Sequence, residues 1–382
     1  MLNIKYISLY ETGGYGIAAG MYLKWLKKAG VNVTWTPMIP GSGLGLGYEP
    51  YDGNDMDDPE LKSICNIDIP YDLVIVHTVP EYFSYWKLRE AGKKVIGMTV
   101  WETDRIPGHW QNLINSVDAV IVPTNWNQKI FAQCGVDVPI YVLPHISEFQ
   151  GVSDDTLNQD HEKFVFYSIS DWTNRKTPSF TVDAFLNAFT DNEAVKLILK
   201  TSDFDFTTPR KFTLPGMKKF RRIKGDLDKR LRKFRTPPEI ELIDRKISPR
   251  EIQALHQNAD CYISLCRAEG WCIPAYEAGW YGNPVVMTGF GGQTEFLKSD
   301  NSYRVDFSLV PVTDSQGGKS YTSNQQWAEP DVGHAAEILQ RIYSDPEAAK
   351  HKGSVLKNYL NQNFAAEKIT KQFIQIIEER RE

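Results

Sequence analysis

Two glutamates, Glu269 and Glu277, lie eight positions apart within residues 261 to 297, CYISLCRAEGWCIPAYEAGWYGNPVVMTGFGGQTEFL. A carboxylate can accept hydrogen bonds from hydroxyl groups, and it can stabilise positive charge that develops in a transition state. The short apolar run 261 to 265 predicts a buried strand before Glu269. Pro274 suits the first turn of a helix, so Glu277 is expected about one turn into that helix. The pattern predicts both carboxylates near the carboxyl end of one strand.

A glycine-rich turn follows the next predicted strand, at residues 284 to 287. In open α/β sheets, ligands bind at the edge where the parallel strands end. Unpaired N–H groups of the helix start and of the turn favour an anion such as a phosphate there. The residues expected to offer these groups are Gly270, Trp271, Cys272, Gly291 and Gly292. The alternative is an ordinary strand–helix–strand unit whose glutamates are solvated.

The frame around the two glutamates is more specific than their spacing alone. It consists of Gly270, Trp271, Pro274, Ala278, Gly282, Pro284 and Val285. With these residues, the stretch resembles the signature of the retaining glycosyltransferases of the GT-B fold, family four. The resemblance implies an α/β protein with two Rossmann-like, doubly wound parallel-sheet domains that face a central cleft. It also implies an enzyme that uses a nucleotide-sugar donor.

Length and composition agree with two domains of ordinary size, since the chain has 382 residues, 42% of them hydrophobic. We expect an acceptor-side domain at 1–150, a nucleotide-sugar-binding domain at 151–360 with a basic insertion at 209–235, and a helix at 361–382. In the resembling family the terminal helices cross back to the first domain. Polar residues 147 to 163 are expected to link the domains.

The charge and cysteine pattern narrows the partners and the compartment. A net charge of −5 argues against a general nucleic-acid binder. No apolar run approaches the roughly 20 residues needed to span a bilayer, and the start reads as a strand and a turn rather than a signal peptide. The five cysteines form no CxxC pair, so we expect free thiols in the cytoplasm and no zinc site.

A glycine turn near the start contains Gly14 and Gly16, which match a GxGxxA dinucleotide fingerprint with Ala19. An NAD site also needs an acidic residue at the end of the second strand, where this chain has Thr36-Pro37. We therefore expect the turn to approach a phosphate or sugar of the donor. A purely structural turn is the alternative.

Candidate acceptor contacts follow two predicted strands of the first domain. Trp101 and Glu102 come after the strand at 94 to 99, where many members of the resembling family have a histidine. An aromatic ring can stack on the apolar face of a sugar, and a carboxylate can accept from its hydroxyls. His77 ends the strand at 71 to 77 and is a further candidate, with a structural histidine as the alternative.

Candidate phosphate ligands follow the first strands of the second domain. The resembling family places an arginine and a lysine on the donor diphosphate, and Lys176 matches that lysine. Ser170 replaces the usual arginine, so its role passes to Arg175 or is lost. Lys200, after the strand predicted at 195 to 199, is another candidate. Simple surface charge is the alternative for each cation.

The basic insertion has a distinctive composition, because residues 210 to 235 hold twelve Lys or Arg and only two Asp. Its apolar residues recur at helical spacing at Met217, Phe220, Ile223, Leu227, Leu231 and Phe234. An amphipathic basic helix can lie on an anionic membrane, at the inner face of the cell membrane, or it can dock on its own domain. An anionic glycan is a further possible partner. Elsewhere, we expect long polar loops at 41–60 and 311–330.

These observations predict a retaining, metal-independent glycosyltransferase whose nucleotide-sugar is a substrate, with no separate cofactor. The acceptor is a glycan, a lipid-linked sugar or another molecule. By resemblance, Glu277 accepts from the ribose hydroxyls, Lys176 with Arg175 or Lys200 neutralises the diphosphate, and Glu269 contacts the transferred sugar. The alternatives are a nucleotide-sugar-binding protein without transfer activity, or a GT-B epimerase or phosphorylase.

Overall fold

Two separate sheets organise the chain in the computed structural model, which describes residues 2–151, 162–189, 194–207, 209, 220–314 and 317–381. One sheet belongs to a unit formed by Met1–Gln150 and Asn361–Glu382, and the other to a unit formed by Gly151–Leu360. In both units strands alternate with helices, as the sequence predicts for doubly wound α/β domains. Part of the expected linker at 147–163 lies outside the described residues.

The first unit contains a seven-stranded sheet in the order β3-β2-β1-β4-β5-β6-β7, parallel except for β3. The strands are β1 (Asn3–Leu9), β2 (Asn32–Pro40), β3 (Tyr48–Pro50), β4 (Leu73–His77), β5 (Lys94–Met98), β6 (Ala119–Val122) and β7 (Ile140–Val142). Every residue of β4 and β6 is buried, because helices cover both faces of the sheet. The strand β3 lies in the segment 41–60, where the sequence predicted only a loop.

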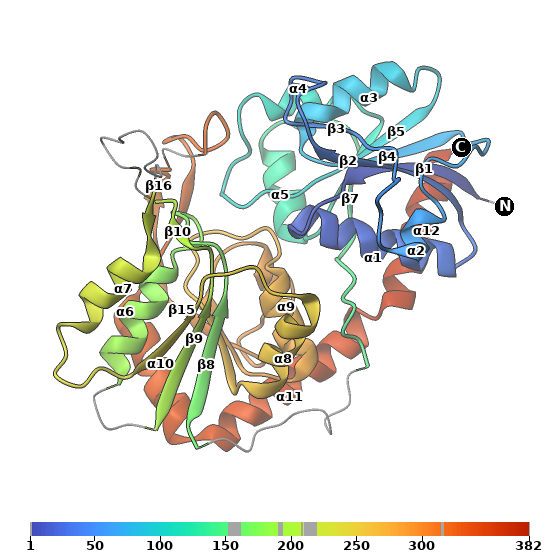
Figure 1. The fold of residues 1–382 in the computed structure, drawn as a ribbon. Helices are drawn as coiled ribbons and strands as arrows, with labels where there is room; N and C mark the ends of the chain where they lie inside the picture. The colour runs from blue at the N-terminus through green and yellow to red at the C-terminus, as the bar shows by residue number, and fades with distance from the viewer. Residues whose placement is uncertain are drawn as a thin grey trace. The chain divides into compact units, whose positions relative to one another are not determined.

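Helices flank this sheet on both sides, with α1 and α12 on one face and α3 and α4 on the other (Figure 1). The helices are α1 (Gly14–Lys28), α2 (Pro59–Lys62), η1 (Pro80–Tyr82), α3 (Phe83–Arg89), α4 (Trp110–Ile114), α5 (Asn125–Gln133) and α12 (Ala366–Arg381). The ring of Phe373 on α12 is fully buried, 5.4 Å from the ring of Tyr22 on α1. The C-terminal helix is thus part of the core of the first unit.

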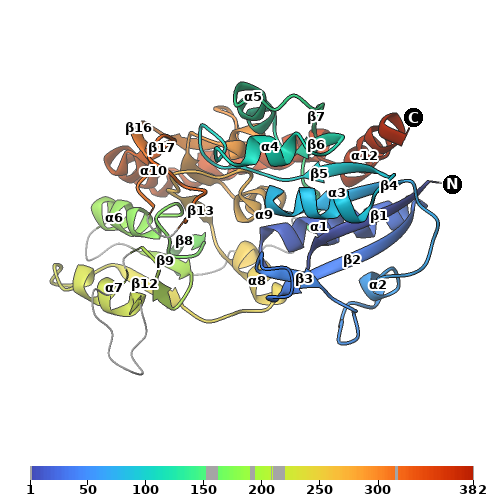
Figure 2. The ribbon, with the colours of Figure 1, turned by 90° about the horizontal axis from the view of Figure 1, so that it is seen from above.

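The second unit contains a six-stranded parallel sheet in the order β12-β9-β8-β13-β14-β15. The strands are β8 (Phe164–Ile169), β9 (Val195–Lys200), β12 (Glu239–Ile243), β13 (Cys261–Ser264), β14 (Val285–Thr288) and β15 (Tyr303–Val305). Its helices are α6 (Pro178–Ala188), α7 (Ile223–Leu231), α8 (Pro249–Asn258), α9 (Ile273–Tyr281), η3 (Gly292–Glu295), α10 (Val332–Ser344) and α11 (Pro346–Asn363). Figure 2 shows α6, α7 and α10 on one face and α8 and α9 on the other.

The amphipathic helix in the basic insertion is shorter than predicted and starts only at Ile223; residues 208 and 210–219 lie outside the described part of the chain. Ile223 and Leu227 are buried in the core of the second unit, and Leu231 and Phe234 pack against it. Just before the helix, β11 (Arg221–Arg222) pairs with β10 (Phe204–Asp205). The apolar face of α7 therefore stabilises its own domain.

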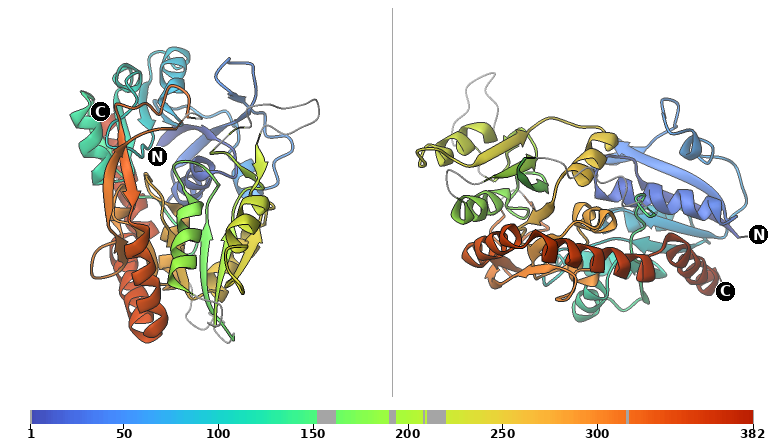
Figure 3. Two further views of the ribbon diagram at one scale, coloured as in Figure 1. Left: turned by 90° about the vertical axis from the view of Figure 1, so that its left-hand side faces the viewer. Right: turned by 90° about the horizontal axis from the view of Figure 1, so that it is seen from below.

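The prediction of a polar loop at 311–330 is wrong for its last five residues, which form the strand β17 (Gln326–Pro330), whereas the described residues between Val312 and Gln325 are loop and turn. β16 (Phe307–Pro311) pairs antiparallel with β17 in a hairpin, and the backbone N–H of Ala328 donates to the carbonyl oxygen of Arg267 at 3.0 Å. The hairpin lies beyond the carboxyl ends of the parallel strands (Figures 1 and 3). Burial of Trp327 against Ala268 and Val312 stabilises the hairpin. Such a tertiary contact cannot be predicted from the local spacing of apolar residues.

Candidate active site

Three loops meet at the carboxyl edge of the second sheet because β8, β13 and β14 are neighbours. The loop after β8 carries Arg175 and Lys176, the loop after β13 carries Glu269, and the turn after β14 carries Gly291 and Gly292. Residues nearly 120 positions apart in sequence are brought together in this way. The carboxyl edge of an open parallel sheet is where such folds bind ligands.

Glu269 is the charged centre of this edge. Its carboxylate forms ion pairs with the ammonium group of Lys176 and, at 3.2 Å, with the guanidinium of Arg175. The Glu269 side chain is only 7% exposed, whereas Lys176 and Arg175 are 23% and 19% exposed. Burial alone would raise the pKa of Glu269, but the two cations and their hydrogen bonds outweigh it, so the pKa is lowered. Glu269 is therefore ionised at neutral pH.

Backbone and side-chain hydrogen bonds tie the three loops together. Arg175 donates from Nη1 to the carbonyl oxygen of Ala268 at 2.8 Å and accepts at its own carbonyl from the N–H of Arg267 at 2.8 Å. The N–H of Gly292 donates to the carbonyl of Glu269 at 2.7 Å. A methyl group on Gly292 would overlap the carbonyl of Gly270, so only glycine allows the turn to lie this close. The three loops are therefore directly linked to one another.

The residues that directly precede two of the helices at this edge have a strained backbone. Thr177 precedes α6 with φ of 40°, and Cys272 precedes α9 with φ of 71°, both in the left-handed region that non-glycine residues avoid. The hydroxyl of Thr177 donates to the carbonyl of Leu265 at 2.6 Å and thereby fixes its loop. Strained backbone of this kind is concentrated at binding and catalytic sites. The strain therefore agrees with a functional role for this edge.

Glu277 is 8% exposed and lies in the middle of α9, about one turn from its start, as predicted. One carboxylate oxygen, Oε2, lies 3.4 Å from Nε2 of His256, which α8 carries and which is fully buried. The hydroxyl of Tyr167 contacts Nδ1 of the same histidine at 2.7 Å. Sequence reasoning missed His256, because a single histidine on a helix gives no signal of what it contacts.

The other predicted donor ligands of the second unit have mixed surroundings. The ring of Trp271 is 3% exposed and packs against Tyr276 and Phe296, so its side chain is a core group. The Cys272 thiol is buried, and burial raises its pKa to about 12. Lys200 is half-buried, and its ammonium donates to the carbonyl of Thr201 at 2.9 Å. If Trp271 and Cys272 contact the donor, they therefore do so through their backbone groups and not through their side chains.

Arg267 is a second residue that the sequence did not single out. Its Nε donates to Glu329 on β17 at 2.6 Å, and its Nη1 donates to the carbonyl of Asn174 at 2.9 Å. The guanidinium also lies over the rings of Phe180 and Trp327, at 5.2 and 5.1 Å from their centroids. Arg267 thus joins the hairpin to the loop that carries Arg175 and Lys176.

The predicted acceptor residues lie in the first unit, and two of them are buried. His77 is 2% exposed, its Nδ1 lies 2.8 Å from the hydroxyl of Tyr6, and burial lowers its pKa to about 3. Trp101 is 3% exposed and donates from Nε1 to the carbonyl of Arg105 at 2.7 Å. Glu102, in the same loop as Trp101, is half-buried. Glu102 is the most accessible of the three for a direct contact.

Gly14 and Gly16, which were predicted to lie in a turn, lie in the first turn of the helix α1. A methyl group on Gly16 would overlap the backbone of Glu11, so glycine is required there for packing. The carboxylate of Glu11 accepts from the hydroxyl of Tyr48 at 2.6 Å. A structural reason therefore exists for Gly16, and a ligand contact of this turn stays a prediction.

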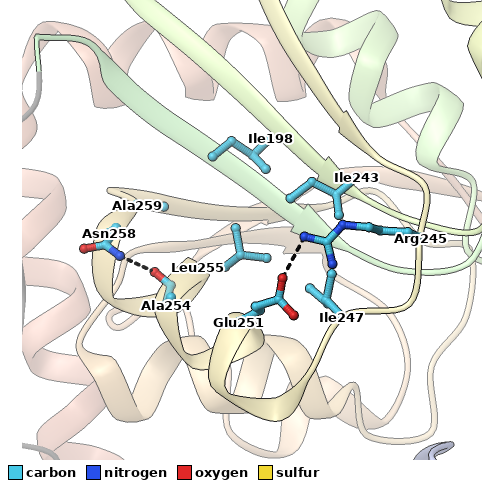
Figure 4. Close-up of a pocket in the computed structure, with 9 residues that line it drawn as sticks. All are labelled: Ile198, Ile243, Arg245, Ile247, Glu251, Ala254, Leu255, Asn258 and Ala259. Atoms are coloured by element: carbon cyan, nitrogen blue, oxygen red, sulfur yellow. Dashed lines mark hydrogen bonds and ion pairs between the residues drawn. The ribbon is translucent and has the colours of Figure 1, made fainter.

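A separate hollow of about 240 Å³ lies beside α8 and contains none of the predicted site residues. Its lining comes from β9, β12, the loop after β12 and α8 (Figure 4). Most of the lining is apolar, and an ion pair of 2.7 Å between Arg245 and Glu251 crosses one side of it.

Among the described residues, no group of three or more His, Cys, Asp or Glu is arranged to hold a metal ion. Within those same residues, none of the helices combines the length and apolarity that a membrane span requires.

Comparison with solved structures identifies the class of fold. HepE of Anabaena, solved in complex with UDP-glucose, superposes with a TM-score of 0.66 at 14% identity, covering 99% of this chain and 100% of HepE. Sucrose-phosphate synthase of Thermosynechococcus elongatus gives 0.67 at 13% identity and 99% coverage of both chains. TarM of S. aureus gives 0.56 at 14% identity, covering 80% of this chain and 55% of TarM. The chain has the GT-B fold of these glycosyltransferases.

Part of the sequence also resembles one family within that class. Residues 226–308, which include β13, α9 and the glycine turn, match the family model described as glycosyl transferases group 1. No curated protein sequence matches this chain. The solved structures confirm the expected GT-B fold, and the match over residues 226–308 agrees with the expected resemblance to group 1 glycosyltransferases.

Proposed function

We propose that this protein transfers a sugar from a nucleotide-sugar donor to a carbohydrate acceptor, with retention of configuration at the transferred carbon. The observation that carries the proposal is the cluster of Glu269, Lys176 and Arg175 at the sheet edge beside the glycine turn. HepE, which shares the fold, was solved with UDP-glucose, and this supports a uridine diphosphate sugar as donor. TarM was solved with UDP and with glycan ligands, which supports a carbohydrate acceptor.

The two cations would stabilise the leaving diphosphate. When the bond to the sugar breaks, negative charge grows on the phosphate oxygens, and positioned cations at that point lower the barrier. Lys176 and Arg175 are suited to this because they are partly exposed and already held at the edge. A diphosphate that binds there would compete with Glu269 for them. Lys200, whose ammonium is half-buried after β9, would be a further phosphate partner.

Glu269 would then face the sugar. Its carboxylate is ionised, and negative charge near the anomeric carbon stabilises an oxocarbenium-like transition state. Glu277 would accept from the ribose hydroxyls, and the N–H groups near Gly270 and the glycine turn would hold phosphate and sugar. The donor is a substrate in this scheme, and neither a metal ion nor a separate cofactor takes part. Glu102, together with Trp101 and His77, would contribute to the acceptor side.

Replacing Glu269 by alanine tests the proposal. We expect the Glu269→Ala variant to lose at least about 100-fold in turnover, a typical electrostatic contribution. Glu239→Ala is a matched control, because Glu239 is a half-exposed carboxylate on β12 of the same unit, paired with Lys163 and Lys196. Its turnover should equal that of the wild type. Near-normal turnover of Glu269→Ala would contradict the role of Glu269.

The donor is identified by a thermal-shift screen of nucleotide sugars, because a ligand that binds only the folded state raises its stability. Transfer assays of the best donor with and without glycan or lipid-linked acceptors then separate the alternatives. Product formed without an acceptor would indicate an epimerase or a phosphorylase. Tight binding with neither transfer nor hydrolysis would indicate a binding protein.

The basic face of α7 is proposed to contact an anionic membrane, which would suit a lipid-linked acceptor at the inner face of the cell membrane. Exposed Lys224, Lys229 and Lys233 supply charge, while the apolar side of the helix is buried in its own unit. Contact would therefore be electrostatic rather than by insertion. Deleting the insertion would remove core residues such as Leu227, so charge reversal is the better test.

The test compares the triple variant K224E/K229E/K233E with the double variant K368E/K371E, whose lysines are exposed on α12. We expect only the α7 variant to lose co-sedimentation with phosphatidylserine vesicles at low salt. Equal sedimentation of all three proteins would refute the membrane contact. Binding of the wild type to an anionic glycan but not to vesicles would indicate a glycan as the partner of this face.

A further inference from the structure

A buried chain of hydrogen-bonding side chains runs from the sheet of the second unit to Glu277. It contains Asn283 after α9, Tyr167 on β8 and His256 on α8, which are 2%, 0% and 0% exposed. Three elements and one loop contribute to it, so it exists only in the folded unit. None of the three residues belongs to the loops that hold Glu269, Lys176 and Arg175.

The hydrogen-bond partners determine the direction of the chain. The side-chain amide of Asn283 donates to the hydroxyl of Tyr167 at 2.9 Å and to the carbonyl of His256 at 2.8 Å. Burial raises the pKa of Tyr167 well above its usual value, so the hydroxyl keeps its proton. The hydroxyl lies 2.7 Å from Nδ1 of His256. In the tautomer whose Nδ1 accepts from this hydroxyl, the ring proton is on Nε2.

The other ring nitrogen of His256 lies next to Glu277. Nε2 is 3.4 Å from Oε2 of the carboxylate, and among the described residues it is the only basic group within 4.0 Å of that carboxylate. The ring itself is held in place by Tyr281, which stacks on it at 5.4 Å with an interplanar angle of 10°. A packed ring nitrogen therefore lies beside one carboxylate oxygen of Glu277, at a distance that a small movement would turn into a hydrogen bond.

We propose that His256 is a positioning residue that holds Glu277 in the orientation needed to accept hydrogen bonds from the donor's ribose, through the chain Asn283–Tyr167–His256. The inference rests on the proposed function, because it takes Glu277 as the ribose partner. A carboxylate fixed by one neighbour loses less conformational entropy on binding than a free one. The ribose preference of the protein thus depends on a residue that never touches the nucleotide.

The test measures how strongly the protein prefers ribose. Isothermal titration calorimetry gives the ratio of the Kd values of the 2′,3′-dideoxy and the normal nucleoside diphosphate, using UDP or GDP, whichever binds the wild type more tightly. We expect a ratio well above one for the wild type and near one for Glu277→Gln. His256→Phe keeps a ring without a donor and should lower the ratio by about tenfold or more, the range of a hydrogen bond to a charged group.

Two further variants separate positioning from folding. His256→Gln retains an N–H donor and should recover part of the ratio, which a purely structural role of the ring would not. Tyr167→Phe removes only the hydroxyl that fixes the tautomer and should give a smaller fall, so it decides the case if His256→Phe does not fold. In His256→Phe/Glu277→Gln, the ratio should equal that of Glu277→Gln alone.

The outcomes are distinguishable from failure of the proposed function. A wild type that binds neither nucleotide, or shows no ribose preference, overturns the role of Glu277 and this inference with it. A wild-type preference that Glu277→Gln abolishes, while folded His256→Phe or Tyr167→Phe retains it in full, overturns only the inference about His256.

Discussion

At the scale of single residues, Glu269 shows how a buried charge is maintained. Taking a carboxylate out of water costs several kcal/mol unless opposite charges and hydrogen bonds compensate, and Lys176 and Arg175 supply both. Without ligand, Glu269 balances only one of the two positive charges, so the cluster keeps a net positive charge. A diphosphate would replace the carboxylate as the partner of the cations and leave Glu269 free to face the sugar.

The lowered pKa of Glu269 predicts a pH-dependent stability. A carboxyl group whose folded pKa lies below its unfolded value, about 4.3 for glutamate, stabilises the fold above that value. The contribution is lost as the pH falls through the lower folded pKa. We therefore expect the stability advantage of the wild type over Glu269→Gln to be largest near pH 7 and to shrink below about pH 4.

Urea unfolding of both proteins between pH 3 and pH 7, followed by tryptophan fluorescence, measures this difference. Glu239→Gln is a suitable comparison, since its carboxylate is also paired with lysines but is 43% exposed. Its stability difference should be smaller throughout. A difference between the wild type and Glu269→Gln that grows toward acid pH would show that the carboxyl group is protonated in the folded protein.

At the scale of elements, the site depends on how closely the glycine turn after β14 approaches the loop after β13. The hydrogen bond from Gly292 to Glu269 links the two backbones directly. Because a side chain at Gly292 would overlap the carbonyl of Gly270, its absence sets the distance between the loops. The position of Glu269 therefore depends on the position of the glycine turn.

Substituting Gly292 by alanine should separate these loops. We expect Gly292→Ala to destabilise the second unit by about 3 kcal/mol, a cost typical of forced overpacking, and to weaken nucleotide binding at least tenfold. Gly225→Ala is the matched control: a methyl group there meets no atom within 4 Å and lies in the helix α7. It should be neutral or stabilising by up to about 1 kcal/mol. Wild-type stability and binding of Gly292→Ala would contradict the close approach.

At the scale of the whole molecule, the first unit is built from two segments that are far apart in the sequence. The chain completes most of the first unit by Gln150, forms the second unit, and then returns its last residues to the first. On α12, Phe373 is fully buried, and Gln372 donates to the carbonyl of Val142 at 2.7 Å. The stability of the first unit therefore depends on residues more than 200 positions away from it in sequence.

Phe373→Ala tests this dependence. We expect a loss of about 3–5 kcal/mol, as for other buried phenylalanines, and faster hydrogen exchange in β4 and β5 of the first unit. Exchange in β13 and β14 of the second unit should stay as in the wild type. Gln375→Ala, at an exposed position two residues further on, should change neither. Faster exchange mainly in the second unit would contradict the assignment of α12.

The sequence by itself determined the doubly wound units and the main elements of the site. Short apolar runs predicted β4, β13 and β14, because strands buried on both faces need continuous apolar sequence. Pro274 predicted the start of α9 to within a residue. Glu269 and its glycine turn were predicted at a sheet edge because local residue types decide where a strand ends and a helix starts.

Only the tertiary structure decided which side chains meet. The ion pairs of Glu269 with Lys176 and Arg175 depend on β8 and β13 being neighbours, which no local pattern specifies. His256 contacts Glu277 because the helices α8 and α9 pack on the same face of the sheet. The strand β17 is stabilised because Trp327 is buried against Ala268 and Val312. Burial of Trp101 and His77 has the same origin. Contacts between distant segments depend on packing, and packing is a property of the whole fold.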